Sequence, residues 1–220
     1  MDEYAKIILV DDHPLFREGM KLLIETEGMG KIIAEAENGQ EFLSMLETME
    51  PDLVLMDIEM PVMNGLEATA KALVMRPGLK ILLLTMLNMK DNYPAMINTG
   101  AMGFVLKTSG KQELEKAIKT VKSGESFFSN EILLRIILDF GKQPVPPDNK
   151  QSSSVYEFTE RELEVLKYLC QGLSVNEIAD KIFRSIKTVE AHRAKLLQKT
   201  NLKNTINLVL YAIKNKLVEF

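Results

Sequence analysis

Short apolar runs alternate with longer amphipathic stretches through the first 123 residues of the chain. Five of these runs predict β-strands, near residues 6–10, 31–36, 53–57, 80–85 and 103–107. The stretches between them carry the apolar spacing of helices, and so do residues 111–123. Strands that alternate with helices are typical of βα units around a parallel sheet. The pattern therefore predicts an α/β fold with a doubly wound, five-stranded parallel sheet in the strand order 2-1-3-4-5.

The second half of the chain has a different character. An apolar stretch near residues 131–139 predicts one further helix, and residues 141–154 have almost nothing to bury, which is typical of a linker. Every periodic segment beyond this linker has the spacing of a helix. We therefore expect two domains, residues 1–125 and 155–220, joined by the extra helix and linker of residues 126–154.

Capping residues divide the last domain into helices. Thr159 with Glu162 and Ser174 with Glu177 form two capping boxes, and Ser185 caps a third helix. A fourth helix follows near the C-terminus. A short helix, a turn of about three or four residues and a second helix make up a helix-turn-helix motif. The sequence therefore predicts a small all-α domain of four helices that contains a helix-turn-helix.

Polar residues stand at the carboxyl ends of four predicted strands. Asp11 and Asp12 follow the first strand, Asp57 ends the third, Thr85 ends the fourth and Lys107 ends the fifth. In an open parallel sheet these ends meet at one edge, where ligands bind. Crowded carboxylates repel one another unless a cation lies among them. We therefore predict a Mg²⁺ site in which one aspartate is free to be phosphorylated.

Phosphoryl transfer depends mainly on positioning and electrostatics, which gives each of these residues a role. Asp57 is the expected nucleophile and phosphoacceptor. Asp12 and Asp57 suit direct ligation of Mg²⁺, and Asp11 suits the outer shell. The Thr85 hydroxyl can donate a hydrogen bond to a phosphoryl oxygen, and the Lys107 ammonium can pair with one.

The second helix of the predicted helix-turn-helix carries basic and polar side chains at dense spacing, which suits entry into the major groove of double-stranded DNA. Phosphate contacts are expected from Lys187, Thr188 and Lys199. Base-edge contacts are expected from Glu190 and Arg193, with Ala194 as a further candidate. The polar residues of the predicted contact set are Lys187, Thr188, Glu190, His192, Arg193, Lys195 and Lys199.

Composition and charge narrow the class of protein. With 46% hydrophobic and 26% charged residues the chain can fill ordinary cores, and no apolar run approaches the roughly 20 residues that span a bilayer. The N-terminus lacks signal-peptide features, and the single cysteine, Cys170, suits a reducing compartment. We therefore expect a cytoplasmic protein with no membrane partner. The formal net charge is −4, but Lys181 to Lys203 holds seven basic residues against one acidic residue, which suits contact with DNA.

Residues 6–123 resemble the receiver domain of two-component response regulators, which has a flavodoxin-like fold. The residues that carry the resemblance are Asp11, Asp12, Asp57, the turn at 61–65, Thr85 and Lys107. The resemblance implies that a histidine kinase or a small phosphodonor phosphorylates Asp57. It also implies that Mg²⁺ is held by Asp12, Asp57 and the backbone carbonyl of Glu59. On phosphorylation, Thr85 would move toward the phosphoryl group and Phe104 would swing inward.

Residues 157–218 resemble the LuxR-type helix-turn-helix. The motifs that carry this resemblance are residues 158–166, 172–179 and 187–193. With the receiver domain upstream, the chain is similar to response regulators of the NarL/FixJ subfamily. In that family a face of the last helix joins two output domains, which implies a homodimer when the protein is phosphorylated. The residues on this face are Leu208, Tyr211 and Ala212. Periodicity alone fits a wider core stripe equally well.

We therefore predict a phosphorylation-switched, DNA-binding transcriptional regulator, which is not an enzyme beyond phosphorylating and dephosphorylating itself. Two alternatives stay open. Met86 after Thr85 and Thr108 after Lys107 depart from the common receiver pattern, and they keep open a regulator that works without phosphorylation. A Mg²⁺-dependent phosphohydrolase of the haloacid-dehalogenase type uses similar residues. In that type the strand of the nucleophile comes first, whereas here the acidic pair leads.

Overall fold

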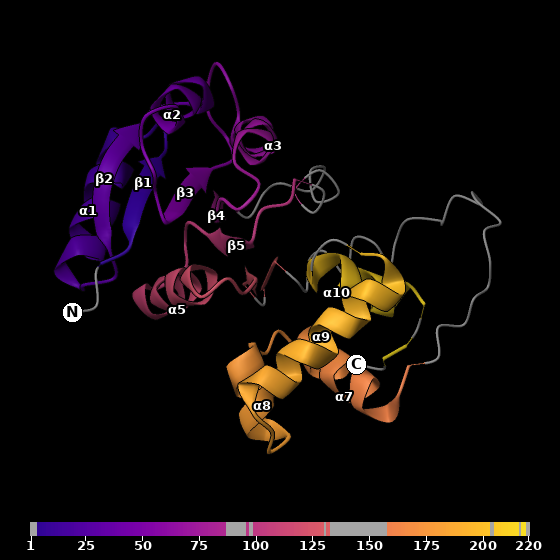
Figure 1. The fold of residues 1–220 in the computed structure, drawn as a ribbon. Helices are drawn as coiled ribbons and strands as arrows, with labels where there is room; N and C mark the ends of the chain where they lie inside the picture. Colours follow the sequence, from indigo (N-terminus) through magenta and orange to yellow (C-terminus); the bar gives the residue numbers. More distant parts are fainter. Residues whose placement is uncertain are drawn as a thin grey trace. The chain divides into compact units, whose positions relative to one another are not determined.

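The computed structural model describes residues 4–86, 96, 99–129, 131–132, 158–202, 205–215 and 217–218. The chain forms two compact units, Met1–Ile132 and Leu133–Phe220. Figure 1 shows the described part of the first unit in indigo to magenta and that of the second in orange to yellow. Glu131 and Ile132 are helical. The rest of the helix predicted near residues 131–139, and the predicted linker, lie outside the described residues.

A parallel sheet forms the centre of the first unit. The strands stand in the order β2-β1-β3-β4-β5-β6, and each neighbouring pair is parallel. The bounds are β1 Lys6–Val10, β2 Lys31–Ala36, β3 Leu53–Asp57, β4 Ile81–Thr85, β5 Gly103–Leu106 and β6 Phe127–Phe128. The five predicted strands and their order are confirmed.

The sixth strand is a difference from the predicted sheet. β6 has only two residues, which is too few to produce a periodic signal in the sequence. It is held against β5 in part by the hydrogen bond from the Ser129 N–H to the Phe104 carbonyl, at 3.1 Å. Gly103 is needed at this point, because a Cβ there would lie 2.5 Å from the carbonyl oxygen of Phe127. The sheet therefore includes the segment that directly precedes the predicted extra helix.

Helices cover both faces of the sheet. Figure 1 shows α1 and α5 on one face and α2 and α3 on the other. Their bounds are α1 Pro14–Thr26, α2 Gly39–Leu46, α3 Gly65–Met75 and α5 Lys111–Lys122. Because both faces are covered, every residue of β3, β4 and β5 is buried, as is usual for the central strands of a parallel sheet.

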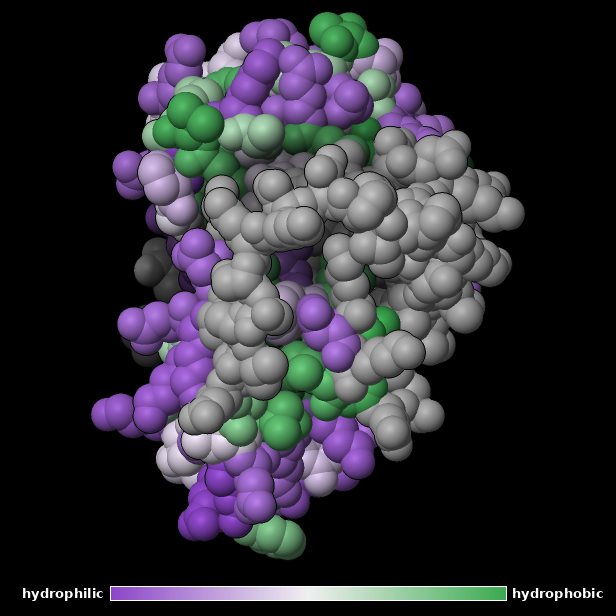
Figure 2. Space-filling view, turned by 90° about the vertical axis from the view of Figure 1, so that its right-hand side faces the viewer, coloured by the Kyte–Doolittle hydropathy of each residue, from purple (hydrophilic) through white to green (hydrophobic). Residues whose placement is uncertain are grey.

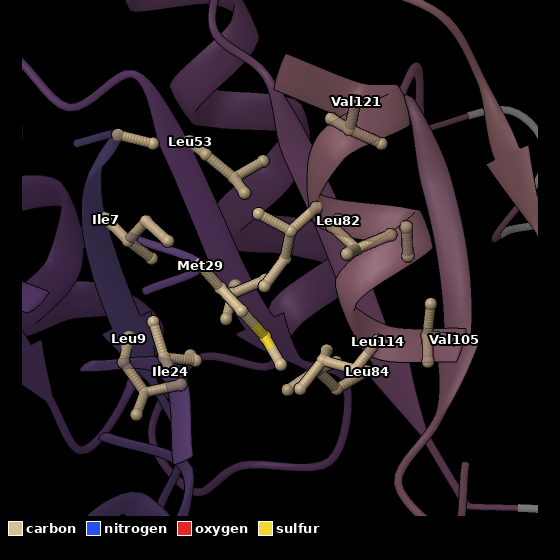
Figure 3. Packing of buried hydrophobic residues seen from close by; sticks show 14 of the residues in the cluster. Ile7, Leu9, Ile24, Met29, Leu53, Leu82, Leu84, Val105, Leu114 and Val121 are labelled. Atoms are coloured by element: carbon tan, nitrogen blue, oxygen red, sulfur yellow. The ribbon is translucent and has the colours of Figure 1, made fainter. Parts of the chain in front are cut away.

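Alternate strand residues build the core beneath α1 and α5. Ile7 and Leu9 of β1 point to the same face of the sheet, and so do Leu82 and Leu84 of β4 (Figure 3). The helices contribute Ile24, Leu114, Ala117, Ile118 and Val121 to this cluster. Since a shift of one residue would turn each strand's apolar side chains to the other face, this packing fixes the register that aligns the strand ends.

Four helices make up the described part of the second unit. They are α7 Glu160–Cys170, α8 Val175–Lys181, α9 Ile186–Thr200 and α10 Thr205–Lys214. Both predicted capping boxes are present, and the Ser185 hydroxyl accepts a hydrogen bond from the Thr188 N–H at 3.2 Å. Cys170 is buried in this core, and burial raises the pKa of its thiol to about 12, which makes it unreactive in the folded protein.

The last helix buries a different face from the predicted one. Leu208 and Ala212 have no exposed surface and belong to the core of the second unit. The prediction that these two side chains lie on a dimerisation surface is therefore wrong, whereas Tyr211 is half-buried. Residues 208–213 are all apolar or aromatic, so periodicity could not identify the buried face.

Isolated apolar side chains are scattered over the surface. On the face in Figure 2, hydrophobic side chains lie in small groups among hydrophilic ones. Among the described residues, the large apolar side chains that are more than two-thirds exposed are Leu15, Leu22, Val62, Val74 and Phe183. None of the helices in the described ranges has the length and apolar character that a bilayer span requires.

Candidate functional site

The strand ends place the predicted pocket residues at one edge of the sheet. Asp11 directly follows β1, Asp57 ends β3, Thr85 ends β4 and Lys107 directly follows β5. Asp11 has no exposed surface, Asp57 is 2% exposed and Thr85 is 3% exposed. The structure therefore brings together the residues that the sequence assigns to the pocket.

Lys107 bridges two of the carboxylates. Its ammonium nitrogen lies 2.7 Å from Asp11 Oδ2 and 2.7 Å from Asp57 Oδ2, and its side chain is 5% exposed. The ammonium also lies 4.8 Å from the ring centroid of Phe16, within the range of a cation–π contact. With Asp12 included, one ammonium faces three carboxylates. The pocket therefore keeps an excess of negative charge, which a divalent cation would offset.

Burial and neighbouring charges together set the pKa values of Asp57 and Lys107. Burial raises the pKa of Asp57 and the charge of Asp11 adds to the effect, which the hydrogen bond from Lys107 offsets only in part. Burial alone would lower the pKa of Lys107. The hydrogen bonds and charges of Asp11 and Asp57 outweigh it, so that the pKa of Lys107 is raised. The lysine is therefore firmly protonated, while the charge on Asp57 is compensated only in part.

The donor set fits a hard divalent cation. One ligand atom from each of Asp11, Asp12, His13 and Asp57 lies within 4.8 Å of the other three. Mg²⁺ prefers carboxylate oxygens and keeps water at its remaining positions. The backbone N–H of Glu59 lies 3.4 Å from Asp57 Oδ1, so this residue stands beside the acceptor. That its carbonyl is a ligand stays a prediction.

Two further residues stand around the acidic pair, and sequence reasoning gave neither a role in the site. Nδ1 of His13 lies 2.8 Å from Asp12 Oδ1 and 3.3 Å from Asp11 Oδ1. Arg17, which is 8% exposed, donates to the backbone carbonyl of Asp11 and, at 2.7 Å, to Glu37 Oε1. The signals were present in the sequence, because His13 follows the acidic pair and Arg17 stands one helical turn further along.

An open hollow of about 680 Å³ gives access to the acceptor. Asp57 and Lys107 line its polar end, and apolar side chains of α1, among them Phe16 and Met20, line its wall. Met86, which is 50% exposed, lies at the same hollow. A phosphodonor would therefore approach Asp57 along an apolar surface.

The two predicted switch residues have distinct positions. The Thr85 hydroxyl donates to the backbone carbonyl of Met86 at 3.1 Å. Phe104 is 1% exposed, so its ring is already inside the protein. Its ring stacks on that of Phe128 in β6, with centroids 5.5 Å apart and planes inclined by 27°. Phe104 therefore links β5 to the short edge strand.

One face of α9 is open to solvent. After Ile186 at the start of the helix, its exposed residues are Lys187, Glu190, Ala191, Ala194, Lys195 and Gln198. They are alternately three and one residues apart, which places them along a single stripe of the helix. Thr188, His192 and Arg193 are partly buried beside this stripe. The small and neutral members Ala191 and Gln198 are absent from the predicted contact set, although helical spacing alone would have identified them.

Lys199, a predicted phosphate contact, pairs with a carboxylate of the same unit. Its ammonium lies 2.6 Å from Glu162 Oε2, and the Glu162 side chain is 4% exposed. Burial opposes the ionisation of Glu162, but the hydrogen bonds from Lys199 and Thr159 outweigh it and lower the pKa of this carboxyl. The ion pair joins α9 to the start of α7. Because the Lys199 side chain is still 35% exposed, its phosphate contact stays a prediction.

Comparisons with known proteins agree with this architecture. The family model of the response regulator receiver domain matches residues 7–119. The family model of the bacterial regulatory proteins of the luxR family matches residues 157–212. The oxygen regulatory protein NreC of Staphylococcus epidermidis is 35% identical over 217 residues, which are 98% of this chain and 100% of NreC.

Solved structures extend the comparison. The response regulator ChrA of a heme-sensing two-component system shares 27% identity with a TM-score of 0.54, over 98% of this chain and 99% of ChrA. A LuxR-family response regulator from Aurantimonas sp. SI85-9A1 shares 33% identity with a TM-score of 0.59, over 64% of this chain and 100% of the other. The chain therefore belongs to the response regulator family.

It joins a receiver domain to a LuxR-type DNA-binding domain, which makes it a phosphorylation-switched regulator of transcription. Response regulators of this type act as transcription factors rather than as enzymes.

Proposed function

We propose that Asp57 accepts the phosphoryl group, with Mg²⁺ as cofactor, and that this modification controls the binding of α9 to double-stranded DNA. The observation that carries the proposal is the environment of Asp57. Its carboxylate is buried at the end of β3, 2.7 Å from the Lys107 ammonium, in a pocket with excess negative charge. A buried nucleophile beside a fixed cation is the arrangement that phosphoryl transfer requires.

Asp57 acts as the nucleophile. One of its carboxylate oxygens forms a bond to phosphorus while the bond from phosphorus to the donor breaks, and the donor keeps the electron pair. The donor atom is an imidazole nitrogen of a histidine kinase, or an oxygen of a small phosphodonor such as acetyl phosphate. Attack of water on phosphorus then breaks the bond from phosphorus to the Asp57 oxygen, which returns the carboxylate and releases phosphate. We propose no enzymatic activity of the chain beyond this self-phosphorylation and self-dephosphorylation.

The chain supplies both the metal ligands and the groups that hold the product. Asp12, Asp57 and the backbone carbonyl of Glu59 hold the ion, with Asp11 in the outer shell. Mg²⁺ neutralises charge on the phosphoryl oxygens when it is bound. Lys107 already lies beside Asp57 Oδ2, so it can pair with an oxygen of the transferred group.

The switch uses Thr85 and Phe104. The Thr85 hydroxyl leaves the Met86 carbonyl and donates to a phosphoryl oxygen, which favours one of two receiver conformations. Phe104 responds from its buried position, where it is stacked on Phe128. The phosphorylated state favours a homodimer, to which Tyr211 remains a candidate contact because it is half-buried.

The DNA-binding surface is the exposed stripe of α9. Lys187, Lys195 and the adjoining Thr188 meet phosphates, and Glu190 with Arg193 reads base edges. His192 lies beside the stripe and adds a polar contact. In a two-fold dimer, two copies of α9 would read inverted half-sites about 10 base pairs apart. We further propose that the protein acts in the cytoplasm, where it meets the DNA and the kinase.

The acceptor is tested by intact-mass measurement after incubation with Mg²⁺ and acetyl phosphate. We expect one phosphoryl adduct on the parent protein and none on Asp57→Asn. The matched variant Asp52→Asn removes the aspartate at the opposite end of β3, outside the pocket, and should keep the adduct. Absence of an adduct on the parent protein, with a histidine kinase donor as well, would leave only the phosphorylation-independent regulator. Multiple turnover of acetyl phosphate into phosphate would favour the phosphohydrolase.

A further inference from the structure

We propose that His13 adds an imidazole ligand to the metal site beside Asp57, so that the site takes Zn²⁺ and similar first-row transition ions more tightly than Mg²⁺. The inference rests on the proposed function, since it concerns the same metal site. It concerns a residue that the proposed Mg²⁺ shell of Asp12, Asp57 and Glu59 does not use.

The separations between donor atoms fit a shared ion. Two ligand atoms bonded at about 2.1 Å to one ion lie about 3.0 Å apart at a right angle and about 3.4 Å apart at a tetrahedral angle. Nδ1 of His13 lies 2.8 Å from Asp12 Oδ1 and 3.3 Å from Asp11 Oδ1. A ligand atom of Asp57 is also within 4.8 Å. In the structure these contacts pair the imidazole with the carboxylates, and an ion held between the same atoms would take the place of the hydrogen-bonded proton.

The backbone holds His13 in this place. Its N–H donates to Asp11 Oδ1 at 2.9 Å, and its carbonyl accepts from the Arg17 N–H at 3.0 Å, in the first turn of α1. The side chain is 69% exposed, so the ring lies at the mouth of the site and an ion can enter without disturbing the core. Little ordering is then needed on binding, which favours affinity.

The chemistry of the ligands decides which ion binds more tightly when an imidazole is added. Mg²⁺ takes oxygen ligands almost alone and gives up its water reluctantly, so an imidazole adds little to its binding. Imidazole suits Zn²⁺, Ni²⁺ and Cu²⁺, and Zn²⁺ binds imidazole nitrogen and carboxylate oxygen together. His13 should therefore raise the affinity for these ions selectively.

Nitrogen NMR of the full-length protein labelled with ¹⁵N-histidine tests the bond directly. The chain has two histidines, His13 and His192, so the spectrum holds few signals. We expect Zn²⁺ to shift one imidazole nitrogen of His13 and Mg²⁺ to leave that nitrogen nearly unchanged. The variant His192→Asn should keep the shift, and His13→Asn should lose it. A His13 signal that Zn²⁺ does not move, while the protein binds the ion, would overturn the inference.

Titration calorimetry measures the selectivity. On the His192→Asn background, His13→Asn should weaken Zn²⁺ binding at least about ten-fold and change Mg²⁺ binding less than about two-fold. Equal losses for the two ions would show that His13 only shapes the carboxylates, and that result would also overturn the inference.

The acetyl phosphate experiment separates this inference from the proposed function. A phosphoryl adduct on Asp57 together with unchanged Zn²⁺ affinity in His13→Asn would overturn the role of His13 alone. No adduct on Asp57, together with a Zn²⁺-induced shift of His13, would overturn the phosphoacceptor and leave the zinc ligand in place.

Discussion

Asp57 holds a charge that the folded receiver compensates only in part. Among the described residues, the cation that pairs with it is Lys107, which is shared with Asp11, and the Asp57 side chain is nearly excluded from water. Because burial raises the pKa of Asp57 above its value in the unfolded chain, ionisation of this residue favours unfolding. This cost is present at neutral pH and disappears as the pH falls below the unfolded-state pKa.

Removing the charge should therefore stabilise the protein. Without divalent ions, Asp57→Asn should raise the free energy of unfolding by about 1 kcal/mol at neutral pH, and the gain should vanish near about pH 3.5. Urea denaturation followed by circular dichroism measures both values. Glu18→Gln neutralises an exposed carboxylate on α1 and serves as the control. An Asp57→Asn protein no more stable than this control would contradict the account of the pocket charge.

At the scale of elements, α1 contains a glycine, Gly19, at a position where the structure has room for a larger residue. Gly19 lies in mid-helix, and a Cβ there would meet no atom within 4 Å. Gly65, the first residue of α3, is the opposite case, because a Cβ there would overlap the backbone carbonyl of Asp57. The two glycines thus form a matched pair, one free and one constrained.

Alanine substitution should separate these two positions. Gly19→Ala should stabilise the protein by about 0.5–1 kcal/mol, since alanine loses less backbone entropy in a helix. Gly65→Ala should destabilise it by more than about 1 kcal/mol and should lower the yield of phosphoryl adduct, because the end of β3 must shift. Urea unfolding and intact mass give the two readouts. Loss of stability in Gly19→Ala would show that α1 has a packing requirement that the structure does not contain.

Along α9, two lysines one helical turn apart have different surroundings. Lys195 is on the exposed stripe of α9, whereas Lys199 pairs with the buried carboxylate of Glu162. The lowered pKa of Glu162 means that its stabilising effect is present above the unfolded-state pKa and is lost as the pH falls through the folded-state value.

The lysine variants should therefore differ in both stability and DNA binding. Lys195→Gln should weaken DNA binding and reduce the slope of log affinity against log salt by about 1, with stability unchanged within about 0.5 kcal/mol. Lys199→Gln should lose about 1 kcal/mol of stability at neutral pH and less in acid, with the salt slope unchanged. Fluorescence anisotropy at several salt concentrations and urea unfolding make the comparison. A reduced salt slope in Lys199→Gln would instead support its predicted phosphate contact.

Features coded within a few residues could be predicted from the sequence, and features set by distant neighbours could not. Strand ends, the pocket aspartates and both capping boxes follow from local patterns. β6 is too short to be periodic, and the buried face of α10 is ambiguous because most of its positions are apolar. Lys199 pairs with Glu162, which lies 37 positions earlier in the chain and on another helix, so no local sequence pattern could predict this contact.

At the scale of the whole molecule, the two functions lie in units of opposite charge. Of the 27 basic and 31 acidic residues, 11 and 8 lie in residues 155–220, which gives this part a formal charge of +3 and leaves −7 for residues 1–154. Phosphorylation adds further negative charge to the acidic part. Phosphorylation of one unit can change DNA binding by the other only if the phosphorylated and unphosphorylated states interact differently with DNA or with a second copy of the chain.

The most direct test is the DNA affinity of one protein before and after phosphorylation. Duplexes selected from a random pool by the phosphorylated full-length protein would serve as the probe, with fluorescence anisotropy as the readout. We expect acetyl phosphate and Mg²⁺ to tighten binding about ten-fold, which is about 1.4 kcal/mol, and to leave Asp57→Asn unchanged. Equal affinities of the parent protein with and without the phosphoryl group on Asp57 would contradict the proposed switch.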